Sequence, residues 1–126
     1  MTLDPIRILV VEDDPTPRVM LQRWLEQHQF DVTVASNGLE ALKRCSEESF
    51  ELVLLDLLMP IMNGLEFLRH YDQLERASDN VVIMTNRPKD EVMEQKPPRV
   101  LDIMTKPFEL VRLLGTMEQW LARRGD

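Results

Sequence analysis

The sequence predicts an α/β fold: a single doubly wound domain with a five-stranded parallel sheet and helices on both faces. Two observations predict it. Short apolar runs alternate with segments of helical periodicity, five times along the chain. The runs also lack the polar alternation of a half-exposed strand, and strands without that alternation are typical of parallel sheets buried on both sides. Right-handed crossovers then place helices on both faces, and we expect the strand order 2-1-3-4-5.

The composition favours one folded domain and excludes several function classes. The chain has 126 residues, of which 44% are hydrophobic, enough for a sizeable core. The net charge of −7 argues against direct binding of nucleic acid or of an anionic membrane, since both require a basic face. The single cysteine, Cys45, fits a reducing compartment. The start of the chain lacks a signal peptide, and no apolar run reaches the roughly 20 residues of a membrane span. We therefore expect a cytoplasmic domain.

Five apolar runs are the expected strands. They cover residues 6–11, 32–35, 52–55, 81–84 and, more weakly, 101–105. Each is short, as buried strands are, and each is followed by polar or turn-forming residues.

The first two helices are expected at 15–28 and after Asn37, a residue type that caps helix starts. In the first, the residues near one stripe are Val19, Leu21, Trp24, Leu25 and His28; the apolar ones are expected to face the core, and His28 is expected at the surface. In the second, the expected inward residues are Leu39, Leu42 and Cys45. Both sets follow the spacing of an amphipathic helix approximately.

The remaining helices differ in strength. The third is expected at 64–74, with Leu65, Leu68 and Tyr71 inward. The fourth, at about 89–95, should be short or irregular, because Pro97 and Pro98 end it, and its inward candidates are Val92 and Met93. The fifth has the clearest apolar stripe: Leu110, Leu113, Leu114, Met117, Trp120 and Leu121.

Polar residues follow four of the expected strands. They are Glu12, Asp13 and Asp14 after the first, Asp56 after the third, Thr85 after the fourth and Lys106 after the fifth. In open α/β sheets, ligands bind outside the carboxyl ends of the strands, where the strand order reverses. Strands one and three are neighbours at that point, so we expect Asp13 and Asp56 to face each other.

This set of groups predicts phosphoryl chemistry. Crowded carboxylates repel one another, and a hard cation such as Mg²⁺ relieves the repulsion. A carboxylate nucleophile, a metal, a hydroxyl and an ammonium are the parts needed to accept a phosphoryl group. Asp14 has two open readings: because Pro15 follows it, it could cap the first helix rather than contact the metal.

The sequence resembles the receiver domains of bacterial response regulators, which have a flavodoxin-like fold. The resemblance covers nearly the whole chain, and its motifs occur in the family's order and spacing. They are Ile8 to Asp14, Leu54 to Pro60, Met62-Asn63-Gly64, Thr85 and Lys106-Pro107-Phe108. It implies one receiver domain over residues 1–126, with a core at about 6–122 and no output domain in this chain.

The resemblance also implies roles for these residues. Asp56 would be the phosphoacceptor, and Thr85 and Lys106 would bind phosphoryl oxygens. Mg²⁺, or Mn²⁺ in its place, would be held by Asp13, Asp56 and the backbone carbonyl of Leu58, with Glu12 acting through water. Such a domain is a signalling module that catalyses its own phosphorylation and dephosphorylation, and is not a metabolic enzyme.

The implied partners are proteins. A histidine kinase or phosphotransfer protein would dock near Pro17, Val19 and Met20 on the first helix. The fourth helix, fifth strand and fifth helix would form the output face. That face would contact a downstream protein or an attached output domain, and it could also mediate dimers.

The chain departs from the family pattern around the site. Asn86 stands where a small residue is usual, Ile103 where many receivers have an aromatic residue, and Arg99-Val100 where a Gly-Ala pair is common. Leu58 and Arg87 occupy two positions that tune dephosphorylation in the family, and their bulk predicts a long-lived phosphoryl group.

Three other function classes fit the residues less well. A non-phosphorylated pseudo-receiver is the main alternative, and the intact acidic residues, Thr85 and Lys106 argue against it. An aspartyl-phosphate hydrolase would need a carboxylate at position 58, where this chain has leucine. A nucleotide-binding protein would need a glycine-rich phosphate loop, which is missing.

Overall fold

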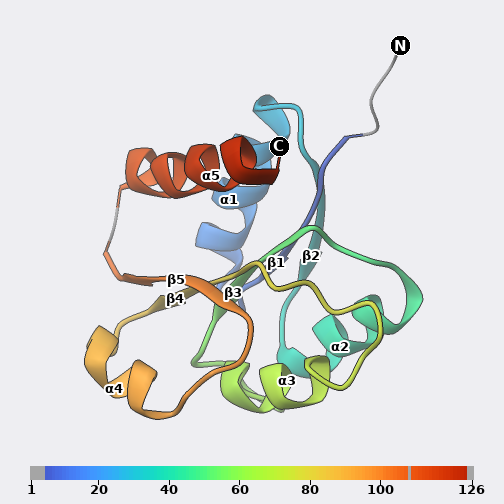
Figure 1. Ribbon diagram of the computed structural model, residues 1–126, viewed down its shortest axis with the longest axis vertical. Coiled ribbons are helices and arrows are strands. Elements are labelled where there is room, and N and C mark those ends of the chain that lie inside the picture. The colour runs from blue at the N-terminus through green and yellow to red at the C-terminus, as the bar shows by residue number, and fades with distance from the viewer. Residues whose placement is uncertain (1–4, 108, 125–126) are drawn as a thin grey trace.

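The computed structural model describes residues 5–107 and 109–124. Its centre is a five-stranded parallel sheet in the order β2-β1-β3-β4-β5, which confirms the predicted order (Figure 1). The strands are β1 (Arg7–Val11), β2 (Asp31–Ala35), β3 (Leu52–Asp56), β4 (Val81–Thr85) and β5 (Val100–Thr105). All five lie at the predicted runs, with ends that differ by one residue.

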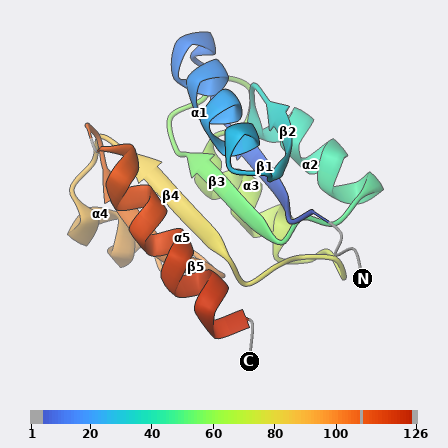
Figure 2. The same ribbon diagram turned by 90° about the horizontal axis from the view of Figure 1, so that it is seen from above.

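Helices cover both faces of this sheet, as predicted. They are α1 (Pro15–Gln27), α2 (Gly38–Glu47), α3 (Gly64–Tyr71), α4 (Lys89–Glu94) and α5 (Leu110–Arg124). Helices α1 and α5 lie on one face, and α2, α3 and α4 lie on the other (Figures 1 and 2).

Alternating residues of the central strands divide the core into two halves. Leu9 and Val11 of β1 belong to the half under α2, α3 and α4, while Ile8 and Val10 belong to the half under α1 and α5. All four side chains are fully buried. This is why the strand sequences read as continuous apolar runs: neither face of the sheet is left for polar residues.

Side-chain caps fix where the first three helices begin. Asp14 accepts a hydrogen bond from the Thr16 amide at 3.1 Å, and Asn37 accepts one from the Glu40 amide at 2.8 Å. Asn63 forms a reciprocal capping box with Glu66 before α3. The structure thus gives Asp14 the capping role, one of its two open readings.

Three residues expected to face inward are exposed. Val19 is 38% exposed, Leu39 54% and Met93 52%. Each is adjacent to, or two positions from, a buried residue of its own helix. One position rotates a side chain by about 100° around the axis, which is enough to turn it out to solvent. The inward residue of α4 is Val92 alone among its two candidates, and the helix is short, as expected.

Arg99 ties the start of β5 to the loop between α3 and β4. It has a φ of 64°, and its guanidinium donates to Asp72 Oδ1 at 2.8 Å, Asp79 Oδ1 at 2.9 Å and the Ala77 carbonyl at 3.1 Å. These three bonds offset the backbone strain that a non-glycine residue meets at positive φ. Arg99 thus has a structural role at the position where a Gly-Ala pair was expected from the resemblance and Arg99-Val100 stands instead.

The strand that follows contains a bulge. Val81 pairs with Val100, whereas Val82 pairs with Asp102, so Leu101 is an extra residue. Asp102 then joins β5 to α5, because its Oδ2 accepts a hydrogen bond from the Thr116 hydroxyl at 2.9 Å. This region of the fold departs from a regular ladder.

Candidate functional site

Three carboxylates meet at the carboxyl edge of the sheet. Oxygen atoms of Glu12, Asp13 and Asp56 all lie within 4.8 Å of one another. Parallel pairing of β1 with β3 brings them together, since Val11 is in register with Leu55 and the acids follow at the same edge. Glu12 is 1% exposed and Asp56 7%, while Asp13 is exposed. The expected approach of Asp13 to Asp56 is therefore present.

Lys106 is the counter-charge of this cluster. Its Nζ donates to Glu12 Oε1 at 2.8 Å and lies 3.6 Å from Asp56 Oδ1. Burial raises the pKa of Glu12, and the hydrogen bond with Asp56 raises it further, while Lys106 acts in the opposite direction. Burial alone would lower the pKa of Lys106, but its hydrogen bond to Glu12 and the two nearby carboxylates outweigh burial and raise that pKa.

Backbone hydrogen bonds hold Thr85 and Lys106 at adjacent strand ends. The Lys106 amide donates to the Thr85 carbonyl at 2.6 Å. The Thr85 hydroxyl, almost fully buried, accepts from the Arg87 amide at 3.0 Å. The hydroxyl proton remains available to a ligand, because that bond uses an oxygen lone pair.

The loop after β3 is braced from two sides. The Gly64 amide donates to the Leu57 carbonyl at 2.9 Å, and the Gly38 amide donates to the Met62 carbonyl at 3.1 Å. A Cβ on Gly64 would lie 2.6 Å from the Asp56 carbonyl oxygen, so only glycine fits there. Leu58, two residues after Asp56, lies within this loop and is 57% exposed.

A cavity of about 480 Å³ opens next to the carboxylates. Its polar lining includes Glu12, Asn86 and Lys106, and its apolar lining includes Pro17 and Met20 of α1. Met20 is 58% exposed. The cavity therefore joins the charged cluster to the apolar start of α1.

The donor set fits a hard divalent cation. Three carboxylates offer oxygen ligands within a small space, and Mg²⁺ is typically bound by one or two carboxylates with water in its other positions. Asp14 is not part of this group, since its carboxylate caps α1. Phe108, the last residue of the Lys106-Pro107-Phe108 motif, lies outside the described residues.

Sequence reasoning missed one side chain at the site. Arg18 of α1 donates hydrogen bonds to the carbonyl oxygens of Glu12 and Asp13. No motif marks it. The one available signal was its place in the first turns of a helix, from which a long side chain reaches back toward the preceding loop.

Comparisons with known proteins agree with this geometry. The family model of the response regulator receiver domain matches residues 8–118. Response regulator MprA of Mycobacterium sp. (strain KMS) is 36% identical over 122 residues, covering 94% of this chain and 52% of that protein. The chain thus spans about half the length of this curated relative.

Solved structures give the same result. Response regulator TrrA of Thermotoga maritima, in complex with Mg²⁺-BeF, is 27% identical, with a TM-score of 0.78 over 90% of this chain and 97% of that one. Chemotaxis response regulator CheY4 of Vibrio cholerae is 24% identical, with a TM-score of 0.83 over 92% and 98%, and shows the shared fold. Among the described helices, none has the length and apolar character needed to cross a membrane.

Proposed function

Because this chain belongs to the response regulator receiver domain family of two-component signalling, we propose that Asp56 accepts a phosphoryl group from a histidine kinase or a phosphotransfer protein. One observation carries the proposal. The carboxylate of Asp56 is buried beside two other carboxylates, and the ammonium of Lys106 lies 3.6 Å from it. Burying such a charge is costly unless it is paired or used in function.

In the proposed step, an Asp56 carboxylate oxygen forms a bond to phosphorus. The bond from phosphorus to the donor breaks, and its electron pair leaves with the donor, which is an imidazole nitrogen of the kinase or of the phosphotransfer protein. The Lys106 ammonium and the Thr85 hydroxyl donate hydrogen bonds to the phosphoryl oxygens, on which negative charge is spread in the transition state. Hydrogen bonds to the backbone hold both residues in place at adjacent strand ends.

Asp13, Asp56 and the Leu58 carbonyl would hold Mg²⁺, with Glu12 acting through a water molecule. The bound ion supplies positive charge that offsets the carboxylates and the phosphoryl oxygens. The three clustered carboxylates support this assignment, and the Mg²⁺-BeF complex of TrrA is the matching observation in a relative. Mn²⁺ has a similar preference for oxygen ligands and could replace Mg²⁺.

A non-phosphorylated pseudo-receiver, acting only as an interaction domain, is the competing function. Incubation with acetyl phosphate and Mg²⁺, followed by Phos-tag electrophoresis, separates the two. We expect a shifted band for the native chain and none for Asp56→Asn, which keeps the shape of the residue but lacks the nucleophile. A native chain without a shifted band would favour the pseudo-receiver, and a band that persists in Asp56→Asn would move the phosphosite.

The phosphoryl group should be long-lived. Leu58 has an apolar side chain that cannot orient an attacking water, and the long side chain of Arg87 follows Thr85 by two residues. We expect the phosphorylated chain to persist for minutes or more in Mg²⁺ buffer, and Leu58→Asn to shorten this lifetime by supplying a hydrogen-bonding group. The decay of the shifted band measures both. A native half-life of seconds would contradict the expectation.

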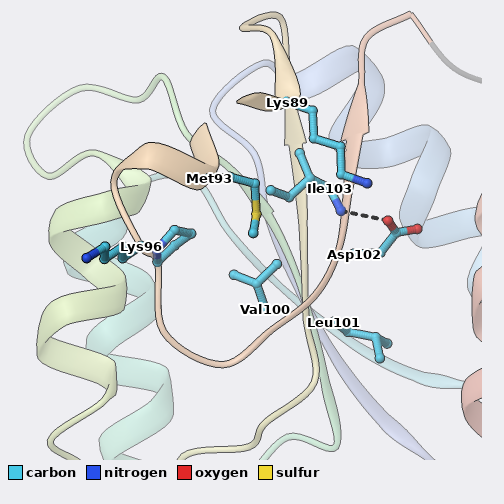
Figure 3. Close-up of a pocket in the computed structure, with 8 residues that line it drawn as sticks. Lys89, Met93, Lys96, Val100, Leu101, Asp102 and Ile103 are labelled. Atoms are coloured by element: carbon cyan, nitrogen blue, oxygen red, sulfur yellow. Dashed lines mark hydrogen bonds between the residues drawn. The ribbon is translucent and has the colours of Figure 1, made fainter. Parts of the chain in front are cut away.

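The output face would include a cavity of about 430 Å³ between α4 and β5. Figure 3 shows Met93, Val100 and Ile103 on its sides, with Lys89 and Lys96 at its margins. Met93 is 52% exposed. A partly apolar surface that also carries two ammonium groups and the Asp102 carboxylate is suited to a protein segment, so we assign downstream contacts, or a dimer, to the face formed by α4, β5 and α5. The kinase would dock at the other cavity, the one of about 480 Å³ that Pro17 and Met20 line.

A further inference from the structure

Arg18 holds the segment that carries the acidic residues after β1. Its Nη1 donates to the Glu12 carbonyl at 3.1 Å and to the Asp13 carbonyl at 3.2 Å. Its backbone amide donates to the Asp14 carbonyl at 3.2 Å. The Arg18 side chain therefore binds the carbonyl oxygens of two consecutive residues that carry carboxylates of the site, while its backbone amide makes the ordinary first bond of the helix.

This arrangement is not what helix stability alone would favour. Arg18 lies in the first turns of α1, where the aligned peptide dipoles present positive charge, and a cation there is unfavourable. The described residues include no ion pair of Arg18 with a carboxylate that would offset this effect. The residue as a whole is half-buried, and its guanidinium binds main-chain oxygens instead.

The bonds of Arg18 supplement a segment that has few others. The Glu12 amide donates to the Ala35 carbonyl at 3.0 Å, and the Asp14 amide approaches Glu12 Oε2 at 3.4 Å. Asp13 itself is exposed, and its carboxylate must keep one direction to remain within 4.8 Å of its neighbours. Fixing the Asp13 carbonyl limits rotation of its peptide group, and with it the direction of the side chain.

We propose that Arg18 is a positioning residue for the divalent cation site: it holds the backbone of Glu12 and Asp13 so that the Asp13 carboxylate points at Asp56. The inference rests on the proposed function, since it assumes that this cluster binds Mg²⁺. Groups that orient metal ligands typically change metal affinity by about 10- to 100-fold when removed. Arg18 acts here through carbonyl oxygens, without contact to the ion.

The positioning role and a simple charge effect predict opposite changes in Mg²⁺ affinity when Arg18 is replaced. A guanidinium near the site repels Mg²⁺, so if charge alone mattered, its removal would tighten Mg²⁺ binding. If positioning dominates, its removal weakens binding. The experiment measures Mg²⁺ affinity by calorimetry at fixed ionic strength, and the unfolding temperature without Mg²⁺, for Arg18→Gln and Arg18→Lys. Arg23→Gln is the control, because it removes the same charge from an exposed position of the same helix.

We expect Arg18→Gln to bind Mg²⁺ about tenfold more weakly, at the lower end of the range for such groups. Its unfolding temperature should stay equal or rise slightly, because a cation leaves the helix start. Arg18→Lys, which can still donate to both carbonyls, should recover part of the affinity, and Arg23→Gln should match the native chain.

Three results would overturn the inference. Equal or tighter Mg²⁺ binding by Arg18→Gln would leave only a charge effect. A parallel loss of affinity and unfolding temperature would indicate a merely structural role. An equal loss in Arg23→Gln would show that the loss does not depend on the two hydrogen bonds of the Arg18 guanidinium. These results leave the proposed function intact, whereas a native chain that binds no Mg²⁺ would overturn both.

Discussion

A Lys106→Met variant should be phosphorylated by acetyl phosphate at least about 100-fold more slowly than the native chain, because one donor to the charge of the transition state is lost. Lys106 Nζ lies 3.6 Å from the Asp56 carboxylate and is the ammonium closest to where the phosphoryl oxygens would sit. Methionine keeps the length and the apolar stem of the side chain but donates no hydrogen bond.

The same variant should bind Mg²⁺ more tightly. In the native structure Lys106 neutralises part of the cluster through its 2.8 Å bond to Glu12, and its removal leaves three carboxylates without that cation. Slower phosphorylation together with tighter Mg²⁺ binding is a combination that unfolding cannot produce. Initial rates from Phos-tag gels and Mg²⁺ titration by calorimetry test it, with the exposed Lys43→Met as control. Native-rate phosphorylation of Lys106→Met would remove Lys106 from the mechanism.

The second large effect should come from Gly64→Ala. A Cβ at this position would lie 2.6 Å from the Asp56 carbonyl oxygen and 2.9 Å from the Leu57 Cα. Both neighbours are backbone atoms, which cannot rotate away as a flexible side chain would. We expect the free energy of unfolding to fall by about 2–3 kcal/mol, as for other overpacked sites. The folded fraction should also be phosphorylated more slowly, because relief of the clash displaces Asp56.

Gly115→Ala is the matched control, with the opposite expected sign. Gly115 lies within α5, and no atom outside its own helical turn lies within 4 Å of the position that a Cβ would take there. Alanine there should raise the free energy of unfolding by about 0.5–1 kcal/mol, since glycine is the weaker helix former. Urea denaturation of both variants measures the difference. If both substitutions change stability equally, the close approach at Gly64 has no energetic consequence.

The strands and the site edge were predictable because they depend on local pattern. An apolar run as short as 52–55 is typical of a buried strand, since helices are usually longer, and a parallel sheet brings the carboxyl ends of its strands to one edge. Asp13 and Asp56 were therefore predicted as neighbours before any distance was known. The short α4 was predictable for a similar reason, since Pro97 and Pro98 follow it.

The exposed faces of the helices were harder to predict. Leu39 and Met93 are apolar, and nothing in the sequence marks them as exposed, because a helix stripe can be shifted by one position at little cost in periodicity. The roles of Arg18 and Arg99 were out of reach for another reason. Arg18 donates to carbonyl oxygens, which every residue carries, so no partner residue type indicates the contact. Arg99 binds carboxylates of Asp72 and Asp79, which lie 27 and 20 residues away in the sequence, and no local pattern selects these two among the acidic residues of the chain. The 2.8 Å bond between Lys106 and Glu12 depends on side-chain geometry alone.

The bulge in β5 has a consequence for self-association of the protein. β5 and β2 are the two edges of the sheet, so their outer backbone groups could pair with a strand of another molecule. On β5, the extra residue Leu101 breaks the regular spacing of those groups, and Asp102 adds a charge two residues from the strand start. On β2, the exposed Asp31 stands at the first position. Both edges are thus poor templates for strand addition, and this protects a sheet made mostly of apolar residues from aggregating through its edge strands.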